Sequence, residues 1–178
     1  DNAPKAAALG AIAAAQELGG EIVLVGRGEA ILQALKDEGV QTLPKGVEIA
    51  NAEDVVDMHD DPATVIRKRK DSSMVVGLQM LRDGQGDAFV SAGSTGALLS
   101  AATLIVKRVK GVRRAALAPV IPTKTGRGAL LIDCGATADC TPEFLLQYAL
   151  MGSLYAEKIM GLTEPRVALL NIGAEDSK

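Results

Sequence analysis

Short apolar runs alternate with segments of helical spacing along the whole of this 178-residue chain. The runs at residues 21–26 and 87–91 have the length of strands, and glycines close several of the helical segments. Such an alternation is typical of an α/β fold, because each helix returns the chain to the same edge of a mostly parallel sheet. We therefore predict one α/β domain over residues 1–178.

The expected elements follow from periodicity, capping residues and glycine stops. We expect strands at 21–26, 47–50, 87–91, 129–133 and 166–171. We expect helices at 4–18, 29–38 and 95–109, and further helices beginning at 61–62, 71–73 and 141–142.

Composition excludes several classes of protein. Hydrophobic residues make up 48% of the chain, which argues against disorder. Aromatic residues make up only 2% and the net charge is −3, so base stacking and a general attraction to nucleic acid are not expected. Two cysteines are too few for a disulfide scaffold or a four-thiolate zinc site and suit a reducing cytoplasm. The chain lacks an initiating Met, a signal peptide and a membrane-spanning run, and we expect it to be the N-terminal half of a longer cytoplasmic protein.

The most informative segment for function is the glycine-rich turn at residues 89–97, which leads from an expected strand into an expected helix. The free N–H groups and the dipole of a helix start favour an anion. Gly93 and Gly96 would let a phosphate approach the backbone, and Ser94 and Thr95 add hydroxyl donors. An ordinary strand–helix turn with a Ser/Thr cap is the alternative, and this segment alone does not decide between them.

Two later strand ends carry similar polar residues. Asp133, Thr137 and Asp139 follow the run at 130–132, and Asn171 and Gly173 follow the run at 168–170. Ligands of open α/β sheets bind outside the carboxyl ends of strands. We therefore predict that these five residues line one crevice together with the glycine-rich turn.

Basic residues form two islands in this acidic chain. Arg67, Lys68, Arg69 and Lys70 are consecutive, and the second island comprises Lys107, Arg108, Lys110, Arg113 and Arg114. Such islands can guide a negatively charged partner, but charge runs are more often solvated helix ends.

Other classes of site find weak support. The sequence Gly26-Arg27-Gly28 lacks the third glycine of a dinucleotide fingerprint, because Ile31 occupies that place. His59 is the only histidine, and Cys134 has no identifiable base, so neither a catalytic triad nor a metal site is expected. We predict no cofactor and no metal.

Several separate motifs together resemble those of the PlsX-type phosphate acyltransferases. They are DSSM at 71–74, SAGSTGA at 91–97, IDCGA at 132–136, QYALMGS at 147–153 and LNIG at 170–173. The resemblance extends over the whole chain. Ser94 and Thr137 stand where that family usually has Asn, which keeps a hydrogen-bonding side chain but loses an amide.

The resemblance implies a three-layer α/β/α fold like those of isocitrate dehydrogenase and phosphotransacetylase, and a homodimer. It also implies the conversion of acyl-[acyl-carrier-protein] and inorganic phosphate into an acyl phosphate in bacterial phospholipid synthesis. The enzyme would work in the cytoplasm or loosely at the inner membrane surface.

Within that reaction, every candidate residue receives a role. Phosphate would be held by Ser73, Gly93, Ser94, Thr95 and Gly96. Catalysis would involve Lys70, Asp133 and Asn171, and the crevice would be lined by Ser72, Thr137, Asp139 and Gly173. The acidic carrier protein would dock on Arg67, Lys68 and Arg69.

Two alternatives remain open. One is a coenzyme A-dependent phosphate acyltransferase, which would share the fold and the chemistry. The other is a non-catalytic protein that binds the acyl carrier protein.

Overall fold

The computed structural model describes residues 2–137 and 139–171. The chain divides into two compact units, Asp1–Lys107 and Arg108–Lys178, and each is described by itself below. None of the helices in the described ranges has the length and apolar character required to cross a membrane.

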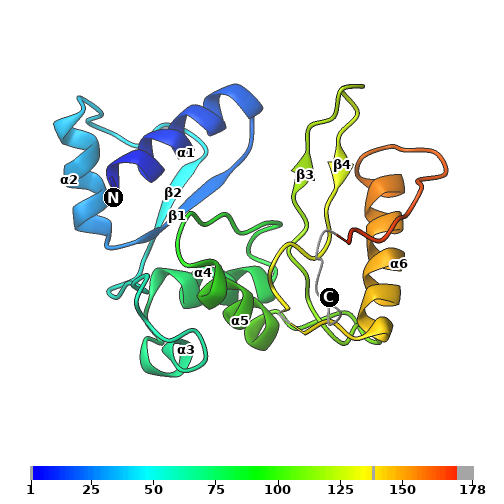
Figure 1. The fold of residues 1–178 in the computed structure, drawn as a ribbon. Helices are drawn as coiled ribbons and strands as arrows, with labels where there is room; N and C mark the ends of the chain where they lie inside the picture. Colours follow the sequence, from blue (N-terminus) through cyan, green and yellow to red (C-terminus); the bar gives the residue numbers. More distant parts are fainter. Residues whose placement is uncertain (1, 138, 172–178) are drawn as a thin grey trace. The chain divides into compact units, whose positions relative to one another are not determined.

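The first unit opens with a parallel strand pair and two helices: α1 (Lys5–Leu18), β1 (Ile22–Gly26), α2 (Gly28–Asp37) and β2 (Val47–Asn51) (Figure 1). All four elements were expected from the sequence and lie within one residue of the predicted bounds. Their shared core consists of Ala8, Ile12, Ile31, Leu35 and Val47.

Local contacts fix the ends of these helices. The left-handed Gly19 (φ 69°) ends α1, and its N–H donates to the Ala15 carbonyl at 3.2 Å. Asn51 at the end of β2 accepts a hydrogen bond from the Gly28 N–H at 2.9 Å and thereby caps the start of α2. The parallel β–α–β arrangement supports the α/β class.

The same unit continues with α3 (Val65–Lys68), α4 (Ser73–Arg82) and α5 (Thr95–Ile105), whose core is Val65, Met74, Leu78, Ala97 and Ala101. The segment after β2 is tied to the start of α4 by two backbone hydrogen bonds. The Ser73 N–H donates to the Asp54 carbonyl at 3.0 Å, and the Asp54 N–H donates to the Asp71 carbonyl at 3.2 Å.

The strand predicted at residues 87–91 is wrong. Among the described residues no β-pairing involves this segment, and Val90 is 93% exposed. The segment is held instead through Phe89, whose ring packs so closely on Gly77 of α4 that a Cβ there would lie 2.4 Å from Cε2. An apolar run becomes a strand only when a neighbouring strand accepts and donates its backbone hydrogen bonds, and local sequence does not reveal that neighbour.

Helix α5 ends at Ile105 rather than at the predicted Val109. The N–H groups of Val106 and Lys107 both donate to the Ala102 carbonyl at 3.0 Å, and Lys107 takes a left-handed conformation (φ 73°). A left-handed residue ends a helix, and a lysine there is not the glycine that sequence rules look for.

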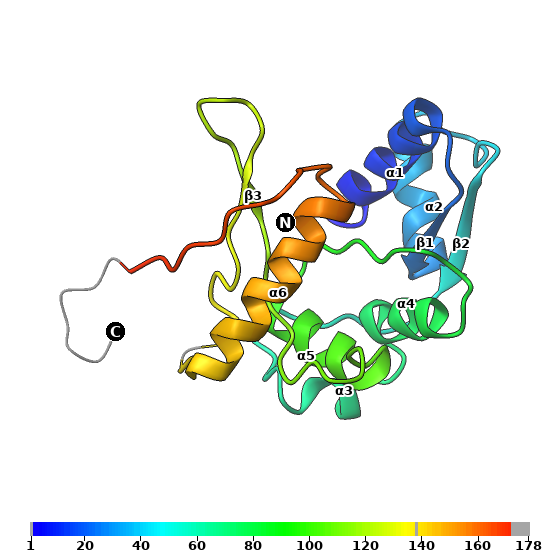
Figure 2. The same cartoon turned by 90° about the vertical axis from the view of Figure 1, so that its right-hand side faces the viewer.

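The second unit contains an antiparallel pair, β3 (Val120–Ile121) and β4 (Ala129–Leu130) (Figure 1), and the long helix α6 (Pro142–Lys158) (Figure 2). Helix α6 begins at the predicted Thr-Pro start, with Thr141 as N-cap and Pro142 at the first helical position. Tyr148 and Ala156 are its buried residues.

Two strand predictions in this unit are corrected. The strand expected at 129–133 is regular only over Ala129–Leu130, because Pro119 has no N–H and the Leu117 N–H donates to the Asp133 side chain. Residues 166–171 form no strand, and Leu169 is 76% exposed. Like residues 87–91, this apolar run has no strand partner among the described residues.

Candidate functional site

The glycine-rich turn leads directly into the N-terminus of α5. Ser94 is the N-cap, only 6% exposed, and its Oγ accepts a hydrogen bond from the Ala97 N–H at 3.4 Å. Thr95 and Gly96 follow as exposed residues. Within the described ranges, the backbone N–H groups of Thr95 and Gly96 have no hydrogen-bond acceptor. The start of α5 therefore offers two free donors and the positive end of the helix dipole.

The two glycines of this turn have different surroundings. A Cβ on Gly96 would lie 3.1 Å from Cγ of Pro62, so this glycine already serves close packing inside the protein. A Cβ on Gly93 would meet Oγ of Ser91 at 3.4 Å, an ordinary contact. Gly93 is therefore packed less tightly than Gly96, and its own N–H donates to Oγ of Ser91 at 3.2 Å.

Helix α4 presents a second capped N-terminus. Its N-cap Ser72 is fully buried, and its Oγ accepts from the Val75 N–H at 3.4 Å. The Ser73 N–H is occupied by the Asp54 carbonyl, so Ser73 can offer a ligand only its half-buried side chain.

The two helix starts lie next to each other. The methyl group of Met74, in the first turn of α4, lies 4.0 Å from the point that a Cβ on Gly93 would occupy. Met74 and Ala97 also share one core cluster. The structure thus places the first turn of α4, which follows Ser72 and Ser73, beside the 93–96 turn.

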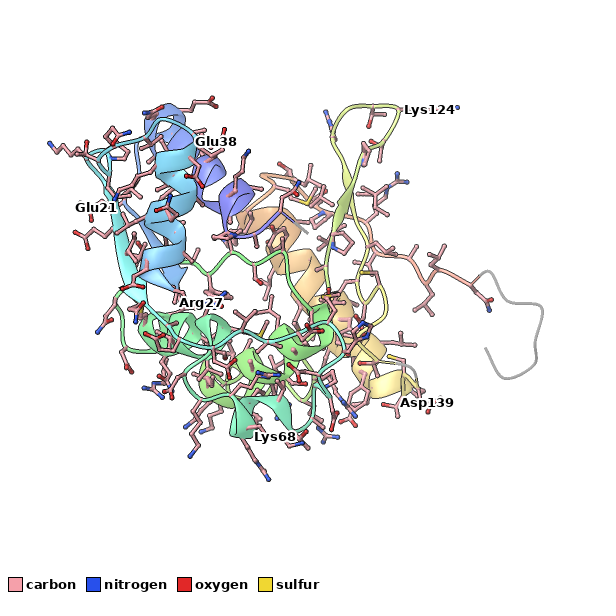
Figure 3. All side chains as sticks on the ribbon, turned by 90° about the vertical axis from the view of Figure 1, so that its left-hand side faces the viewer. Glu21, Arg27, Glu38, Lys68, Lys124 and Asp139 are labelled. Carbon is pink, nitrogen blue, oxygen red and sulfur yellow. The ribbon has the colours of Figure 1, made fainter. Side chains whose placement is uncertain are left out.

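The predicted basic run contains side chains with different roles. Arg67, Lys68 and Lys70 are exposed, and Lys68 projects outward from its helix (Figure 3). Arg69 is half-buried and forms ion pairs with Asp54 at 2.9 Å and Asp60 at 2.8 Å. Arg69 therefore holds the 54–60 loop against α3.

These contacts shift two pKa values. The pKa of Asp60 lies below its ordinary value, first because the Asp57 N–H donates to the carboxylate and second because Arg69 does so. The pKa of Arg69 is raised, mainly by the hydrogen bond to Asp60. Both shifts stabilise the charged pair.

In the second unit, Asp133 organises the turn that follows β4. Its Oδ1 accepts from the N–H groups of Leu117 at 3.1 Å and Ala136 at 3.0 Å. Its Oδ2 is buried and has no hydrogen-bond partner among the described residues. This carboxylate positions the loop through Oδ1, while Oδ2 is shielded from solvent.

The remaining predicted crevice residues vary in exposure. Thr137 Oγ1 lies 3.1 Å from the buried Tyr148 hydroxyl, and Asp139 and Asn171 are exposed. Gly173 lies outside the described residues. The crevice shared by these residues and the 93–96 turn stays a prediction.

The features expected to be non-catalytic are located at the surface. Cys134 and Cys140 are both free and exposed, and His59 lies in an exposed turn where its N–H donates to Asp57. In the described part of the chain, no group of three or more His, Cys, Asp and Glu side chains could hold a metal ion.

Sequence reasoning missed three residues that shape the site: Pro62 beside Gly96, Asp54 beneath the start of α4, and Asp60 beside Arg69. The helix predicted to begin at Asp61-Pro62 begins instead at Val65, with Thr64 as N-cap. The contact of Pro62 with Gly96 joins positions 34 residues apart and leaves no local signal. The sequence offered one usable hint of the ion pairs. Acidic residues at 54, 57 and 60 precede the basic run, and charges of opposite sign that are close in sequence can pair.

Comparisons with known proteins agree with one another. The family described as "Fatty acid synthesis protein" matches residues 1–178. The chain is 47% identical to a phosphate acyltransferase of Heliobacterium modesticaldum, 46% identical to one of Desulfitobacterium hafniense and 44% identical to one of Bacillus cytotoxicus. Each match covers 100% of this chain and 52% of the relative, so the chain spans about half the length of these curated relatives. On this evidence the chain belongs to the fatty acid synthesis protein family.

Proposed function

We propose that the protein is a phosphate acyltransferase that converts acyl-[acyl-carrier-protein] and inorganic phosphate into acyl phosphate and free carrier protein. The observation that carries this proposal is the pair of helix starts at Ser73 and at Gly93–Gly96, with free N–H groups on Thr95 and Gly96. Adjacent helix starts with hydroxyl side chains suit a phosphate anion. The names of the relatives add independent support.

The chemistry needs no covalent enzyme intermediate. A phosphate oxygen attacks the thioester carbonyl carbon, a C–O bond forms, and the carbonyl electrons move to the oxygen. When the tetrahedral intermediate collapses, the C–S bond breaks and the carrier thiolate leaves with the electron pair. Because phosphate is already an anionic nucleophile, the protein must mainly hold it in place and stabilise the oxyanion.

The proposed roles follow from this scheme. Phosphate is held by the N–H groups of Thr95 and Gly96 and by the hydroxyls of Ser73, Ser94 and Thr95, and the absence of a side chain on Gly93 lets it approach the backbone. The Ser94 hydroxyl accepts from Ala97 and keeps its own proton to donate. Lys70 supplies positive charge, and Asp133 and Asn171 orient the thioester in a crevice also lined by Thr137, Asp139 and Gly173. Ser72, expected to line this crevice, is fully buried and acts instead as the cap of α4.

The carrier protein would dock on the exposed Arg67 and Lys68, with Arg69 behind them in its ion pairs. The family resemblance supports the remaining parts of the proposal. These are a cytoplasmic homodimer that contacts the membrane surface loosely, a three-layer α/β/α fold, and one α/β domain over residues 1–178 that is the N-terminal half of a longer chain.

Product trapping tests the reaction. The complete polypeptide that the gene encodes is incubated with acyl-[acyl-carrier-protein], phosphate and hydroxylamine, and an acyl hydroxamate is expected because a mixed anhydride acylates hydroxylamine readily. Coenzyme A thioester serves as the comparison donor. Equal turnover with both donors would indicate the coenzyme A-dependent enzyme, and carrier-protein binding without hydroxamate would indicate the non-catalytic binder.

A further inference from the structure

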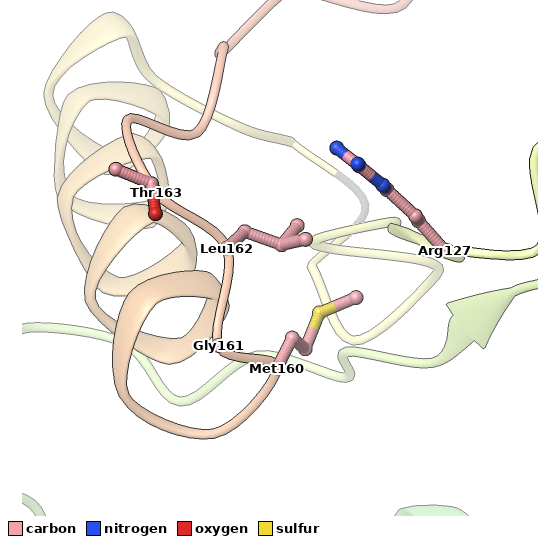
Figure 4. Close-up of a pocket in the computed structure, with 5 residues that line it drawn as sticks. All are labelled: Arg127, Met160, Gly161, Leu162 and Thr163. Carbon is pink, nitrogen blue, oxygen red and sulfur yellow. The ribbon is translucent and has the colours of Figure 1, made fainter.

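The second unit contains a surface hollow that the proposed reaction does not use. It lies between the loop joining β3 to β4 and the segment that follows α6, and its wider part measures about 600 Å³. A narrower part of about 430 Å³ adjoins it and shares Arg127, Leu162 and Thr163 (Figure 4).

Close packing joins the two walls of the hollow. Gly128 has a positive φ of 76°, and a Cβ there would lie 2.7 Å from Cγ1 of Val120 and 3.5 Å from Cε of Met160. The missing side chain thus lets Met160 lie against the hairpin. On the opposite wall, the Leu162 N–H donates to the Ala156 carbonyl at 3.0 Å and fixes the segment to the end of α6.

The hollow combines an apolar wall with a cationic edge. Figure 4 shows the side chains of Met160 and Leu162 directed from the α6 side toward Arg127. Arg166 lines the same hollow, and neither arginine forms an ion pair with a carboxylate of the described residues. Glu164 is the one acidic residue in the lining, so the two arginines leave an excess of positive charge.

Hydroxyl groups complete the cationic edge. Thr123, Thr125 and Thr163 line the hollow, and the first two lie 3.1 Å apart between their Oγ1 atoms. Lys124 stands at the tip of the hairpin between them (Figure 3). Arginine forks and threonine hydroxyls are suited to an anion with several acceptor oxygens, such as a phosphate ester.

We propose that this hollow binds the phosphate ester of a pantetheine-type arm, the flexible thiol-bearing chain of the acyl donor. The choice of this ester rests on the proposed function, in which the acyl group arrives as a thioester. In such an arm, the phosphate is followed by a dimethyl-substituted carbon. The phosphate then binds to Arg127 and Arg166, and the dimethyl group packs against Leu162 and Met160.

A pair of ligands that differ only in the phosphate tests this proposal. Binding of 4′-phosphopantetheine and of pantetheine to the complete polypeptide is measured by calorimetry or ligand-observed NMR. We expect the phosphorylated arm to bind about tenfold more tightly, because charge-assisted hydrogen bonds to the arginines are lost without the phosphate. Its affinity should also fall as the salt concentration rises.

Variants locate the site. Arg127→Gln and Arg166→Gln should each weaken 4′-phosphopantetheine about fivefold to tenfold and leave pantetheine unchanged. Arg127→Lys should keep part of the affinity, since the charge remains and the bidentate fork is lost. Lys110→Gln is the control. It removes one exposed positive charge elsewhere in the unit and should leave the affinity for both ligands unchanged.

Three results would overturn the assignment. These are equal affinity for the two ligands, unchanged affinity in folded Arg127→Gln and Arg166→Gln variants, and displacement of 4′-phosphopantetheine by an equal concentration of inorganic phosphate. The last result would indicate a plain anion site. A different pair of results would disprove the proposed reaction and still support this site. In that case 4′-phosphopantetheine would bind more tightly than pantetheine, but thiol release would not depend on inorganic phosphate.

Discussion

The Met74 methyl group lies 4.0 Å from the point where a Cβ on Gly93 would stand, which places the first turn of α4 beside the turn that begins α5. Each helix begins with a buried serine cap, Ser72 and Ser94. Two positive helix ends therefore lie beside each other, and an anion bound at the free N–H groups of Thr95 and Gly96 would reduce their mutual repulsion.

Substitutions at Ser94 separate helix capping from phosphate binding. Both Ser94→Asn and Ser94→Asp retain an oxygen that can accept from the Ala97 N–H, so the thermal stability of both variants should stay near that of the parent. The aspartate carboxylate would repel phosphate and should raise its KM about tenfold or more, whereas asparagine should not. Ser94→Ala should lower stability by about 1 kcal/mol. Equal phosphate KM values for the Asn and Asp variants would place the anion elsewhere.

Gly96 has a structural constraint of its own. In Gly96→Val, the added side chain must enter the space next to Pro62, where a Cβ already lies at 3.1 Å from Cγ. We expect a loss of about 1–3 kcal/mol from this overpacking, measured by denaturant unfolding, together with a raised phosphate KM. Adding Pro62→Ala should restore part of the stability without restoring phosphate binding. If the double variant regains both, Gly96 acts only through packing.

The hydrogen bonds that Asp60 accepts from the Asp57 N–H and, second, from Arg69 give the protein a defined acid response. The pKa of Asp60 is lowered in the folded state from 3.8, so its contribution to stability is present above pH 3.8 and is lost as the pH falls through the folded pKa. Asp60→Asn should therefore melt at a lower temperature than the parent near neutral pH, and the two melting curves should converge in strong acid. A melting-temperature difference that stays constant down to about pH 2 would contradict this account of Asp60.

The exposed and the half-buried residues of the basic run should behave differently. Arg67→Glu and Lys68→Glu should raise the KM for the acyl carrier protein several-fold and flatten its salt dependence, with little effect on melting temperature. Arg69→Gln should chiefly lower the melting temperature, because Asp54 and Asp60 lose their partner. Lys45→Glu is the charge-matched control, since this lysine is exposed and distant in sequence from the run. If Lys45→Glu raises the KM for the acyl carrier protein as much as Arg67→Glu does, this KM depends only on the overall charge of the protein.

Local chemistry made much of this fold predictable. Ser72 and Thr141-Pro142 mark the starts of α4 and α6 because a cap acts within one helical turn. The strands expected at 87–91 and 166–171 could not be judged in this way, because a strand depends on a pairing partner far along the chain. The α/β class is supported by the parallel pair of β1 and β2, whereas the larger sheet stays a prediction.

The candidate site, like the fold, was predictable only where it depends on neighbouring residues. The helix start at the 93–96 turn was readable from its glycines and hydroxyls, which belong to one continuous segment, whereas its binding of an anion stays a prediction. The ion pairs of Arg69 and the contact of Gly96 with Pro62 were not readable, because each depends on how a loop folds back.

The dependence of thiol release on phosphate tests the central claim most directly. The complete polypeptide is supplied with acyl-[acyl-carrier-protein] after contaminating phosphate has been removed enzymatically, and free thiol is followed as phosphate is added back. We expect no turnover above the uncatalysed rate without phosphate and a saturable rise with it. Undiminished thiol release in the absence of phosphate would make water the acceptor and the protein a thioesterase, which would contradict this account.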